Sequence, residues 1–508
     1  MTDASHDTIS GDRGLHIEEP LIFEQDSPGA LGVDWPEVEA NAERLGGLAR
    51  QGPIGLPSLA EPTVVRHYTR LSQKNYGIDT GLFPLGSCTM KHNPRLNERL
   101  ARLPGFADIH PLQPESTVQG ALRLCRELQR WLSALTGMPC VALTPGAGAH
   151  GELCGMMAIR AALEARGEDS AARRRVLVPD SAHGTNPATA AALGFQVVSI
   201  PEDTRGRIDP ARFEALLEGG VAAIMLTNPN TCGVFENDIR RIADAVHEAG
   251  GYFYCDGANF NAIVGRVRPG DLGIDAMHLN LHKTFSTPHG GGGPGAGPVV
   301  FSEALAPYAP VPRIIEEDNG LLRLEEANGA AFGRMKAFHG QMGMFVRALA
   351  YLMSHGADGL RQVSGDAVLN ANYVLRRLED VFSAPFAHAG PAMHEALFDD
   401  RSLRDSGVAT LDIAKAMIDE GLHPMTVYFP LVVHGAMLVE PTETETRASL
   451  DRFIAVMRGL AERAKDGAAL SEAPHYAPRR RLDETRAARR PVLRWQPAGD
   501  AGSDRPDV

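Results

Sequence analysis

Short β-branched runs that alternate with helical stretches constrain the fold of this chain more than any other feature. The runs are "RRVLVPD", "FQVVSIPE", "VAAIMLTNPN", "GYFYCDGAN" and "AMHLNLHK". The third and fourth are separated by "DIRRIADAVHEAGG", an amphipathic helical pattern that ends at glycine. Another helical pattern, with apolar residues at helical spacing, runs from Ser116 to a glycine stop at Gly137. Strands that alternate with helices need crossover connections, so the sequence predicts an α/β fold with a mainly parallel sheet covered on both faces.

The pattern of predicted elements changes after about residue 340. Longer helical patterns follow, "MFVRALAYLMSHGADGLRQV" and "DAVLNANYVLRRLEDVF", and then mixed short segments up to "LDRFIAVMRGLAERAKD". We therefore expect a large α/β domain over residues 71–339 and a smaller C-terminal α+β domain over residues 340–495. Residues 1–70 have the composition of an arm and linker, and residues 496–508 that of a disordered tail.

Composition and charge exclude several classes of protein. With 508 residues, 44% of them hydrophobic and 22% charged, the chain is ordinary globular material with room for more than one domain. A net charge of −13, without a long basic stripe, argues against a nucleic-acid binder. The arginines of "RRRLDETRAARRP" are interleaved with acids, as in a solvated or interface helix.

Targeting and cysteine signals point to the cytoplasm. The first eighteen residues are polar and lack the apolar core of a secretory signal, and no uncharged apolar run approaches the about 18 residues of a spanning helix. The six cysteines lack CxxC spacing, which predicts reduced thiols rather than disulfides or a zinc site. We expect a soluble cytoplasmic protein that has no metal site and does not bind a membrane.

Polar clusters fall where the predicted strands end. In an open parallel sheet, ligands bind beyond the carboxyl ends of the strands. The stretch "TPGAGAHGEL" contains a glycine-rich turn, Thr144 to Gly148, that opens a helix whose N–H groups and dipole suit a phosphate. Three further clusters, "PDSAHGTNPA", "YCDGANFN" and "HLNLHKTFS", supply His183, Asp256 and Lys283.

Each cluster alone has an ordinary structural explanation: a tight connection, a loop histidine, an N-cap aspartate or a solvated lysine. Together they match the needs of pyridoxal 5'-phosphate (PLP), which are an anion site, a group against the ring, an acid for the pyridine nitrogen and a lysine for the aldehyde. Their order along the chain is that of PLP enzymes with the aspartate-aminotransferase fold. A nucleotide P-loop is excluded, because its lysine follows the glycines whereas Lys283 precedes them.

A run of glycines, Gly290–Gly293, follows Lys283 closely. Backbone without side chains can pack against a cofactor or let a loop move aside. A merely flexible loop would have the same sequence, so both explanations stay open.

Long stretches of the chain resemble one enzyme family. The matching segments include "FPLGSCTMKHNPRLNE", "FADIHPLQPESTVQG", "TPGAGAHGEL", "PDSAHGTNPATA", "LHKTFSTPHGGGGPGAGPV", "LVEPTETET" and "RRLDETRAARRPVLRW". The resemblance covers nearly the whole chain, from about Pro20 to Trp495. On these motifs the sequence resembles glycine dehydrogenase (decarboxylating), the P-protein of the glycine cleavage system, in its form as a separate catalytic subunit, subunit 2.

The resemblance implies an aspartate-aminotransferase-like, fold type I structure with PLP on Lys283. It assigns His183 to stacking on the ring and to proton movement, and Asp256 to the pyridine nitrogen. Further cofactor contacts are implied for Gly146, Ala147, Gly148, Thr231, Ala258 and His282. In "LGSCTMKHNP", the most distinctive segment of the family, we assign cofactor or substrate contacts to Ser87, Thr89 and Asn93, with a buried polar turn as the alternative for each.

The resemblance also implies a reaction and partners. Glycine would lose its carboxylate as CO2, and the aminomethyl group would pass to the lipoyl group of the H-protein. Because the chain matches only the catalytic half of fused P-proteins, a separate glycine dehydrogenase subunit 1 is expected, in an α2β2 assembly. The first seventy residues are a candidate contact surface for it.

Some positions depart from the family pattern. They are Phe83, His92, Gln341, Met342, Met425 and the segment "HEALFDD" over residues 394–400. None is the lysine, the histidine or the aspartate, so the departures put only strict glycine specificity in doubt. Two alternatives stay open: a specialised paralogue that acts on another small amino acid, and a non-catalytic assembly subunit, against which Lys283 argues.

Overall fold

A computed structural model describes residues 19–33, 36, 42–168, 173–289, 295–465, 469–477 and 480–494 of the chain. The chain divides into two compact units. One comprises Met1–Asn75, Ile418–Gly421 and Ala469–Val508, and the other comprises Tyr76–Met417 and Leu422–Ala468. All of the described candidate site residues belong to the second, larger unit. The domain boundaries expected at residues 70, 339 and 495 stay predictions.

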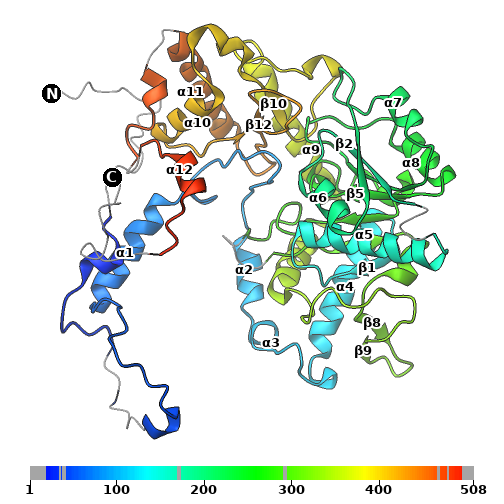
Figure 1. Ribbon diagram of the computed structural model, residues 1–508, viewed down its shortest axis with the longest axis horizontal. Coiled ribbons are helices and arrows are strands. Elements are labelled where there is room, and N and C mark those ends of the chain that lie inside the picture. Colours follow the sequence, from blue (N-terminus) through cyan, green and yellow to red (C-terminus); the bar gives the residue numbers. More distant parts are fainter. Residues whose placement is uncertain are drawn as a thin grey trace. The chain divides into compact units, whose positions relative to one another are not determined.

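The larger unit is built on a seven-stranded sheet with the strand order β1-β7-β6-β5-β4-β2-β3 (Figure 1). Its strands are β1 (Cys140–Ala142), β2 (Arg175–Pro179), β3 (Gln196–Ile200), β4 (Val221–Thr227), β5 (Tyr252–Asp256), β6 (Ala276–His278) and β7 (Val299–Phe301). Strand β7 runs antiparallel to both of its neighbours, and the other pairs are parallel. The predicted mainly parallel sheet is confirmed, and each of the five β-branched runs forms one of its strands.

Helices cover both faces of this sheet, as predicted (Figure 1). On one face α5 (Gly148–Ala165) and α6 (Thr185–Ala192) pack against the sheet, and on the other lie α4 (Gln119–Thr136) and α8 (Ile239–Glu248). The side chains of β4 alternate accordingly: Met225 joins the apolar cluster of α5, and Ile224 joins that of α4 and α8. Burial on both faces explains why the strands read as continuous apolar runs.

The remaining helices include one with an internal kink. They are α1 (Glu61–Lys74), α2 (Arg95–Ala101), α3 (Pro104–Ala107), α7 (Pro210–Ala215), α9 (Met342–Leu378), α10 (Thr410–Asp419), α11 (Arg447–Lys465) and α12 (Glu484–Arg489). Helix α4 ends at Gly137, whose φ of 72° is the left-handed conformation expected of a glycine stop. The two helical patterns predicted after residue 340 join in α9, and the kink lies within the first of them, at Gly356, which has φ 60° and ψ −171°.

The C-terminal part of the larger unit mixes helices with a small antiparallel sheet. Its strands β10 (Ala396–Phe398), β12 (Met437–Val439) and β11 (Thr426–Val427) are ordered β10-β12-β11. A separate hairpin pairs β8 (Arg313–Glu316) with β9 (Leu322–Glu325). Helix α11 packs on α9 beside the small sheet. The α+β character expected of the C-terminal region is confirmed.

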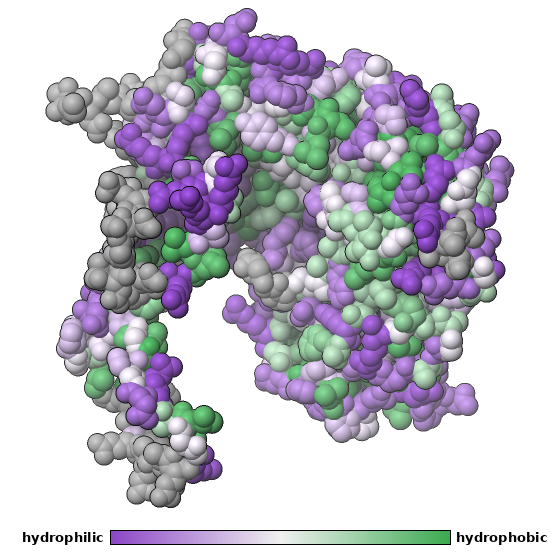
Figure 2. Space-filling view, in the orientation of Figure 1, coloured by the Kyte–Doolittle hydropathy of each residue, from purple (hydrophilic) through white to green (hydrophobic). Residues whose placement is uncertain are grey.

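The smaller unit is mostly exposed. Within α1, only His67 is buried, and its ring and the guanidinium of Arg70 both contact the carboxylate of Glu19. Apolar side chains lie at the surface of this unit, among them Leu31, Leu45, Leu48, Ile54 and Leu56, and the space-filling view shows hydrophobic side chains along it (Figure 2). Among the described residues, no helix has the length and apolar character needed to cross a membrane.

Candidate active site

A cavity of about 220 Å³ lies beyond the carboxyl ends of the central parallel strands. Eight of the candidate residues line it: Ser87, Gly148, His183, Thr231, Asp256, Ala258, His282 and Lys283. They come from segments almost 200 residues apart in the sequence, and the parallel sheet brings their loops to one edge. The cavity is smaller than the roughly 300 Å³ at which drug-sized pockets begin, so it suits a small ligand.

Lys283 reaches the cavity from the turn that follows β6. Its backbone N–H donates to the carbonyl of Asn280 at 3.0 Å, which fixes the turn. Its Nζ donates to the carbonyl oxygen of Ser87 at 2.5 Å. The next four residues, 284–287, are buried, so the lysine extends from a rigid base.

Asp256 ends β5 and is only 2% exposed. Its Oδ1 accepts the Ala258 N–H at 2.9 Å and its Oδ2 accepts the Asn186 amide at 3.1 Å, while the ring of His278 lies 3.4 Å from Oδ1. Burial alone would raise the pKa of Asp256. The electrostatic effect of His278, the Ala258 N–H and Lys283 outweighs burial and lowers that pKa below its ordinary value. A charged carboxylate is therefore held at the floor of the cavity.

A second carboxyl group, Glu152, was not predicted from the sequence. It lies on α5, lines the same cavity and is held at 2.8 Å by the Asn186 amide that also bonds Asp256. Burial first, and then the charge of Asp256, raise the pKa of Glu152 to about 8. Helical spacing offered a signal, because Glu152 follows Gly148 by one turn and shares its face.

His278 is the other unpredicted group beside Asp256. Its Nδ1 is hydrogen-bonded to the hydroxyl of Tyr254 at 2.6 Å. Burial lowers the pKa of His278, because the ring is fully enclosed. The floor of the cavity thus combines an anionic Asp256 with a Glu152 that is neutral near pH 7.

His183 lies at the exposed rim of the cavity. Its Nδ1 accepts the Thr185 N–H at 3.2 Å, which leaves the ring proton on Nε2 when the imidazole is neutral. The Phe429 ring lies edge-on to it, with centroids 5.9 Å apart. Thr231, also in the lining, donates its hydroxyl to the carbonyl of Ser181 at 2.5 Å. Stacking by His183 on a cofactor ring stays a prediction.

The glycine-rich turn before α5 offers an anion site. The first N–H groups of an α-helix have no intrahelical partner, and those of α5 open toward the cavity at Gly148. A Cβ on Gly148 would lie 2.6 Å from Asn280 Oδ1, so glycine is required there by close packing. Gly146 and Ala147 lie just outside the lining, and Gly146 donates its N–H to His150 at 3.2 Å. The Gly290–Gly293 run lies outside the described residues.

Two of the residues assigned within "LGSCTMKHNP" do not reach the cavity. Thr89 is buried and donates its N–H to Glu440, and the amide of Asn93 donates to the carbonyl of Ser286 at 2.9 Å. The buried-turn alternative describes these two contacts, whereas Ser87 lines the cavity. Substrate contacts by Thr89 and Asn93 stay predictions that this geometry does not favour.

The single-residue departures from the family pattern lie away from the cavity. Phe83 stacks on His423 with ring centroids 3.7 Å apart, and His92 is exposed at the surface. Gln341 precedes α9, Met342 begins it, and Met425 is buried in the core. None of these residues lines the cavity.

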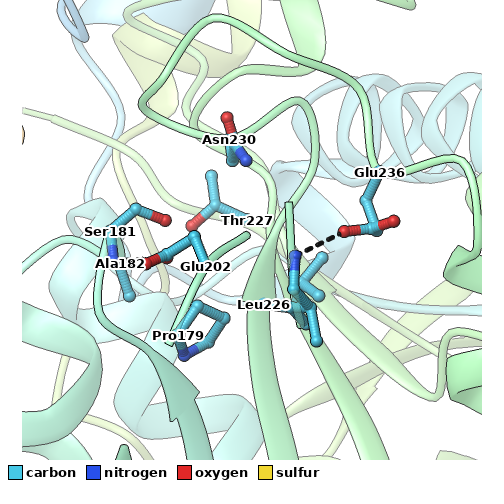
Figure 3. Close-up of a pocket in the computed structure, with 9 residues that line it drawn as sticks. Pro179, Ser181, Ala182, Glu202, Leu226, Thr227, Asn230 and Glu236 are labelled. Carbon is cyan, nitrogen blue, oxygen red and sulfur yellow. Dashed lines mark hydrogen bonds between the residues drawn. The ribbon is translucent and has the colours of Figure 1, made fainter. Parts of the chain in front are cut away.

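Two other cavities lack this convergence of candidate residues. A larger one, of about 510 Å³, is lined mainly by residues of 101–125 and 324–345 and contains none of the candidate residues. A cavity of about 10 Å³, the volume of roughly one water, lies between the ends of β2 and β4 (Figure 3). Burial raises the pKa of both carboxyl groups that line it, Glu202 and Glu236.

Two clusters have ligand types that could hold a metal ion. They are Glu152, Asp256 and His278 in the cavity, and His394, Glu395 and Glu440 behind Ser87. In each cluster the candidate ligand atoms lie within 4.8 Å of one another. The expectation of no metal stays a prediction.

Comparison with known proteins gives consistent matches. Residues 363–475 match the family described as glycine dehydrogenase, C-terminal domain, and residues 154–293 match aminotransferase class-V. A probable glycine dehydrogenase (decarboxylating) subunit 2 of Caulobacter vibrioides is 66% identical over 98% of this chain and 95% of that protein. A protein of the same name from Pyrococcus abyssi is 49% identical over 94% of this chain and 96% of its own length.

Solved structures share the fold. The crystal structure of an inhibitor-bound glycine decarboxylase (P-protein) of the glycine cleavage system matches with a TM-score of 0.68 at 22% identity, over 85% of this chain and all of that one. A cysteine desulfurase from Thermococcus onnurineus matches with a TM-score of 0.57 at 14% identity, over 76% of this chain and 95% of that one. These likenesses confirm the predicted fold type.

Proposed function

Because the chain belongs to the glycine dehydrogenase (decarboxylating) subunit 2 family, we propose that it decarboxylates glycine with PLP bound through Lys283. The convergence of Lys283, Asp256 and His183 in one cavity at the carboxyl edge of the sheet carries this assignment. Family membership supports the reaction, and the cavity supports the residues that perform it.

The residues present fit PLP. Lys283 offers an amine for the aldehyde, Asp256 a carboxylate for the pyridine nitrogen, and the first turn of α5 an anion site for the phosphate. Two buried polar atoms near Lys283, Asn280 Oδ1 and His282 Nδ1, have no hydrogen-bond partner among the described residues, as expected of atoms that face a polar ligand.

The chain's own groups then have distinct tasks. When bound, PLP supplies an electron sink for the charge that develops on the glycine carbon as CO2 leaves. Asp256, kept anionic, would hold the proton of the pyridine nitrogen. Lys283 would hold the cofactor through its Nζ, and the Ser87 carbonyl is the hydrogen-bond acceptor for that amine when it is free. His183, with a proton on Nε2 at the rim, can donate to an incoming group.

Two partners complete the proposed reaction. The aminomethyl group would pass to a lipoylated H-protein, whose arm would enter at the exposed rim beside His183. A subunit 1 would complete an α2β2 assembly, in keeping with the name of the relatives as subunit 2. The departures from the family pattern lie outside the cavity, so no observation favours a substrate other than glycine.

The test begins with the visible absorption spectrum of the chain after PLP has been added. Borohydride reduction and peptide mass mapping should place the adduct on Lys283, and glycine-dependent exchange of labelled CO2 should follow when the partners are supplied. Lys283→Ala should lose both signals. The matched control is Lys465→Ala, which removes a 63% exposed lysine on α11 and should keep both. An adduct on another lysine, or none, would refute the cofactor assignment; an adduct without CO2 exchange would refute the substrate.

A further inference from the structure

Residues 85–89 lie against β12 as a single β-bridge at Leu85 followed by a turn. Leu85 pairs with Val439, and Glu440 donates its N–H to the carbonyl of Pro84 at 3.3 Å. A Cβ on Gly86 would lie 2.6 Å from the carbonyl oxygen of Leu438, so the two backbones are in direct contact. This segment, which we term the Ser87 segment (residues 85–89), thus packs against the small sheet of the same unit.

Two residues of the Ser87 segment have unfavourable backbone conformations. Ser87 has a φ of 61° and Thr89 a φ of 45°. Side chains with a Cβ rarely adopt such values, and a β-branched residue like threonine does so least readily. Conformations of this kind persist only where the surroundings hold them in place.

Two buried carboxyl groups hold these residues. Glu395 accepts the Ser87 N–H, and Oε2 of Glu440 accepts the Thr89 N–H at 2.9 Å. Both glutamates are fully buried, and each has one further oxygen without a hydrogen-bond partner among the described residues. One oxygen of each lies within 4.8 Å of the other and of a ring nitrogen of His394.

The two carboxyl groups lie close enough to affect each other electrostatically. Burial, and then the charge of Glu440, raise the pKa of Glu395 well above its ordinary value. The other titratable groups that interact with this pair are Lys283, His394, Cys88, Cys232 and His289. Burial lowers the pKa of His394, which therefore adds no positive charge at neutral pH.

The residue whose N–H donates to Glu395 also contacts the lysine through its carbonyl group. The N–H of Ser87 points to Glu395, and its carbonyl oxygen accepts from Lys283 Nζ at 2.5 Å. A rotation about the N–Cα bond of Ser87 toward a relaxed φ would move the peptide that carries this carbonyl and so remove the acceptor from the lysine. The conformation of one strained residue therefore decides where the amine lies.

We propose that Glu395 and Glu440 are positioning residues that hold the Ser87 segment in its strained conformation and thereby place the Ser87 carbonyl as the acceptor for the Lys283 amine. The inference rests on the proposed function of Lys283. Neither glutamate lines the cavity, so each acts through the backbone of the Ser87 segment.

The test measures the reactivity of the Lys283 amine in the PLP-free chain. Limiting acetic anhydride is added, and acetylation of Lys283 relative to the exposed Lys465 is read by peptide mass spectrometry. Glu395→Ala should raise the ratio about fivefold, because an ammonium that loses its acceptor gives up its proton more readily. Glu395→Gln still accepts the Ser87 N–H and should stay within about twofold of the unaltered chain.

A glycine substitution at position 87 tests whether Glu395 acts through the backbone conformation of this residue. Glycine adopts a φ of 61° without strain. Adding Ser87→Gly to Glu395→Ala should therefore return the ratio toward that of the unaltered chain. Adding Ser87→Ala, which also removes the hydroxyl but keeps the Cβ, should not. Equal rescue by both changes, or an unaltered ratio in Glu395→Ala, would overturn the inference.

A second pair of variants, at Glu440 and Thr89, tests the same inference in case Glu395→Ala does not fold. Glu440→Ala should raise the same ratio, and Thr89→Gly added to it should restore the ratio, whereas no rescue by Thr89→Gly would count against the inference. Borohydride trapping of added PLP is measured on each chain. An unaltered chain that traps no PLP on Lys283 refutes the proposed function, whereas one that traps PLP but shows no response to Glu395→Ala refutes only the positioning role.

Discussion

At the scale of single residues, the cavity floor holds two carboxyl groups of opposite character. The Asn186 amide donates to both, yet the pKa of Asp256 is lowered and that of Glu152 is raised to about 8. The nearby His278 and the Ala258 N–H favour the charge on Asp256, and that charge then disfavours a second one on Glu152. One negative charge therefore faces the ligand over the neutral pH range.

Glu152→Gln should stabilise the fold increasingly as the pH rises. The folded chain keeps the Glu152 proton up to about pH 8, whereas the unfolded chain releases it near its ordinary pKa of 4.5. The wild-type carboxyl group therefore loses stability as the pH rises through this window, and the amide does not, so the difference should grow to the order of a few kcal/mol. Urea unfolding at pH 5 and at pH 8.5 measures it.

The control for this change is Glu164→Gln, on the exposed side of the same helix α5. It should leave the pH dependence of unfolding as it is in the unaltered chain. A stabilisation by Glu152→Gln that is the same at both pH values would contradict the raised pKa.

The residues predicted from the sequence are those that end a strand or a turn. Lys283, Asp256 and His183 fall at strand ends, where topology alone brings them to one edge. Glu152 reaches the site from a helix face, and Glu395 contacts the site residue Ser87 from 308 residues away in the sequence. No local pattern encodes a contact of that separation, so these partners required the structure.

At the scale of elements, the motif "LGSCTMKHNP" mainly connects other segments of the larger unit and supplies few residues to the site. Lys91 is fully buried, and its Nζ donates to Glu443 at 2.7 Å, to the Thr284 carbonyl at 2.8 Å and to Asn261 at 2.9 Å. The motif thus joins the turn after Lys283 to the segment after β12. This function explains why a distinctive motif contributes only one residue to the cavity lining.

Lys91→Met should destabilise the larger unit by about 3–5 kcal/mol, because it leaves Glu443 as a buried charge without its partner. Adding Glu443→Gln should recover about 1–3 kcal/mol, since the amide carries no charge to bury. Urea unfolding of both variants measures the difference, with the exposed Lys465→Met as control. A double variant that is less stable than Lys91→Met would contradict the buried ion pair.

Gly356→Ala should destabilise helix α9 through its backbone alone. Gly356 has φ 60° and ψ −171°, a conformation almost confined to glycine, and a Cβ there would meet no atom within 4 Å. The cost should be about 1–3 kcal/mol of unfolding free energy. Gly329→Ala is the control, because Gly329 also has open space but no positive φ. An equal change in the free energy of unfolding of the two variants in urea would contradict a backbone cost specific to Gly356.

Sequence patterns predicted five strands of the central sheet and missed the other two, β1 and β7. The five β-branched runs and the helices before and between them form as expected, because their periodicity extends over enough residues. Strands β1 and β7 span three residues each and were not predicted. Their identity as strands depends on the antiparallel pairing between them, across about 160 residues of chain.

At the scale of the whole molecule, exposed apolar side chains gather in the smaller unit. Leu48 is 89% exposed, and Ile54 and Leu56 are exposed by 70% and 71%. Apolar groups in such number at a surface are typical of a protein interface. They agree with the expectation that the N-terminal region contacts a partner subunit.

Leu48→Asp combined with Ile54→Asp should weaken association with subunit 1 by at least about tenfold. Capture of PLP on Lys283 should stay unchanged, because neither residue belongs to the unit that contains the cavity. Analytical ultracentrifugation of the mixed subunits measures association. Leu369→Asp, on the exposed side of α9, is the control, and equal weakening by this change would contradict the assignment of the interface.

The contacts of the Ser87 segment also set the order of events during synthesis on the ribosome. The hydrogen bonds of Ser87 and Thr89 cannot form until Glu395 and Glu440 have been synthesised, and these lie 308 and 351 residues later in the chain. At translation rates of about 5–20 residues per second, that interval lasts roughly 15–70 s. A nascent chain that already contains Lys283 therefore lacks the two glutamates that hold the Ser87 carbonyl in place for its amine, and cofactor capture in its final geometry belongs to the nearly completed polypeptide.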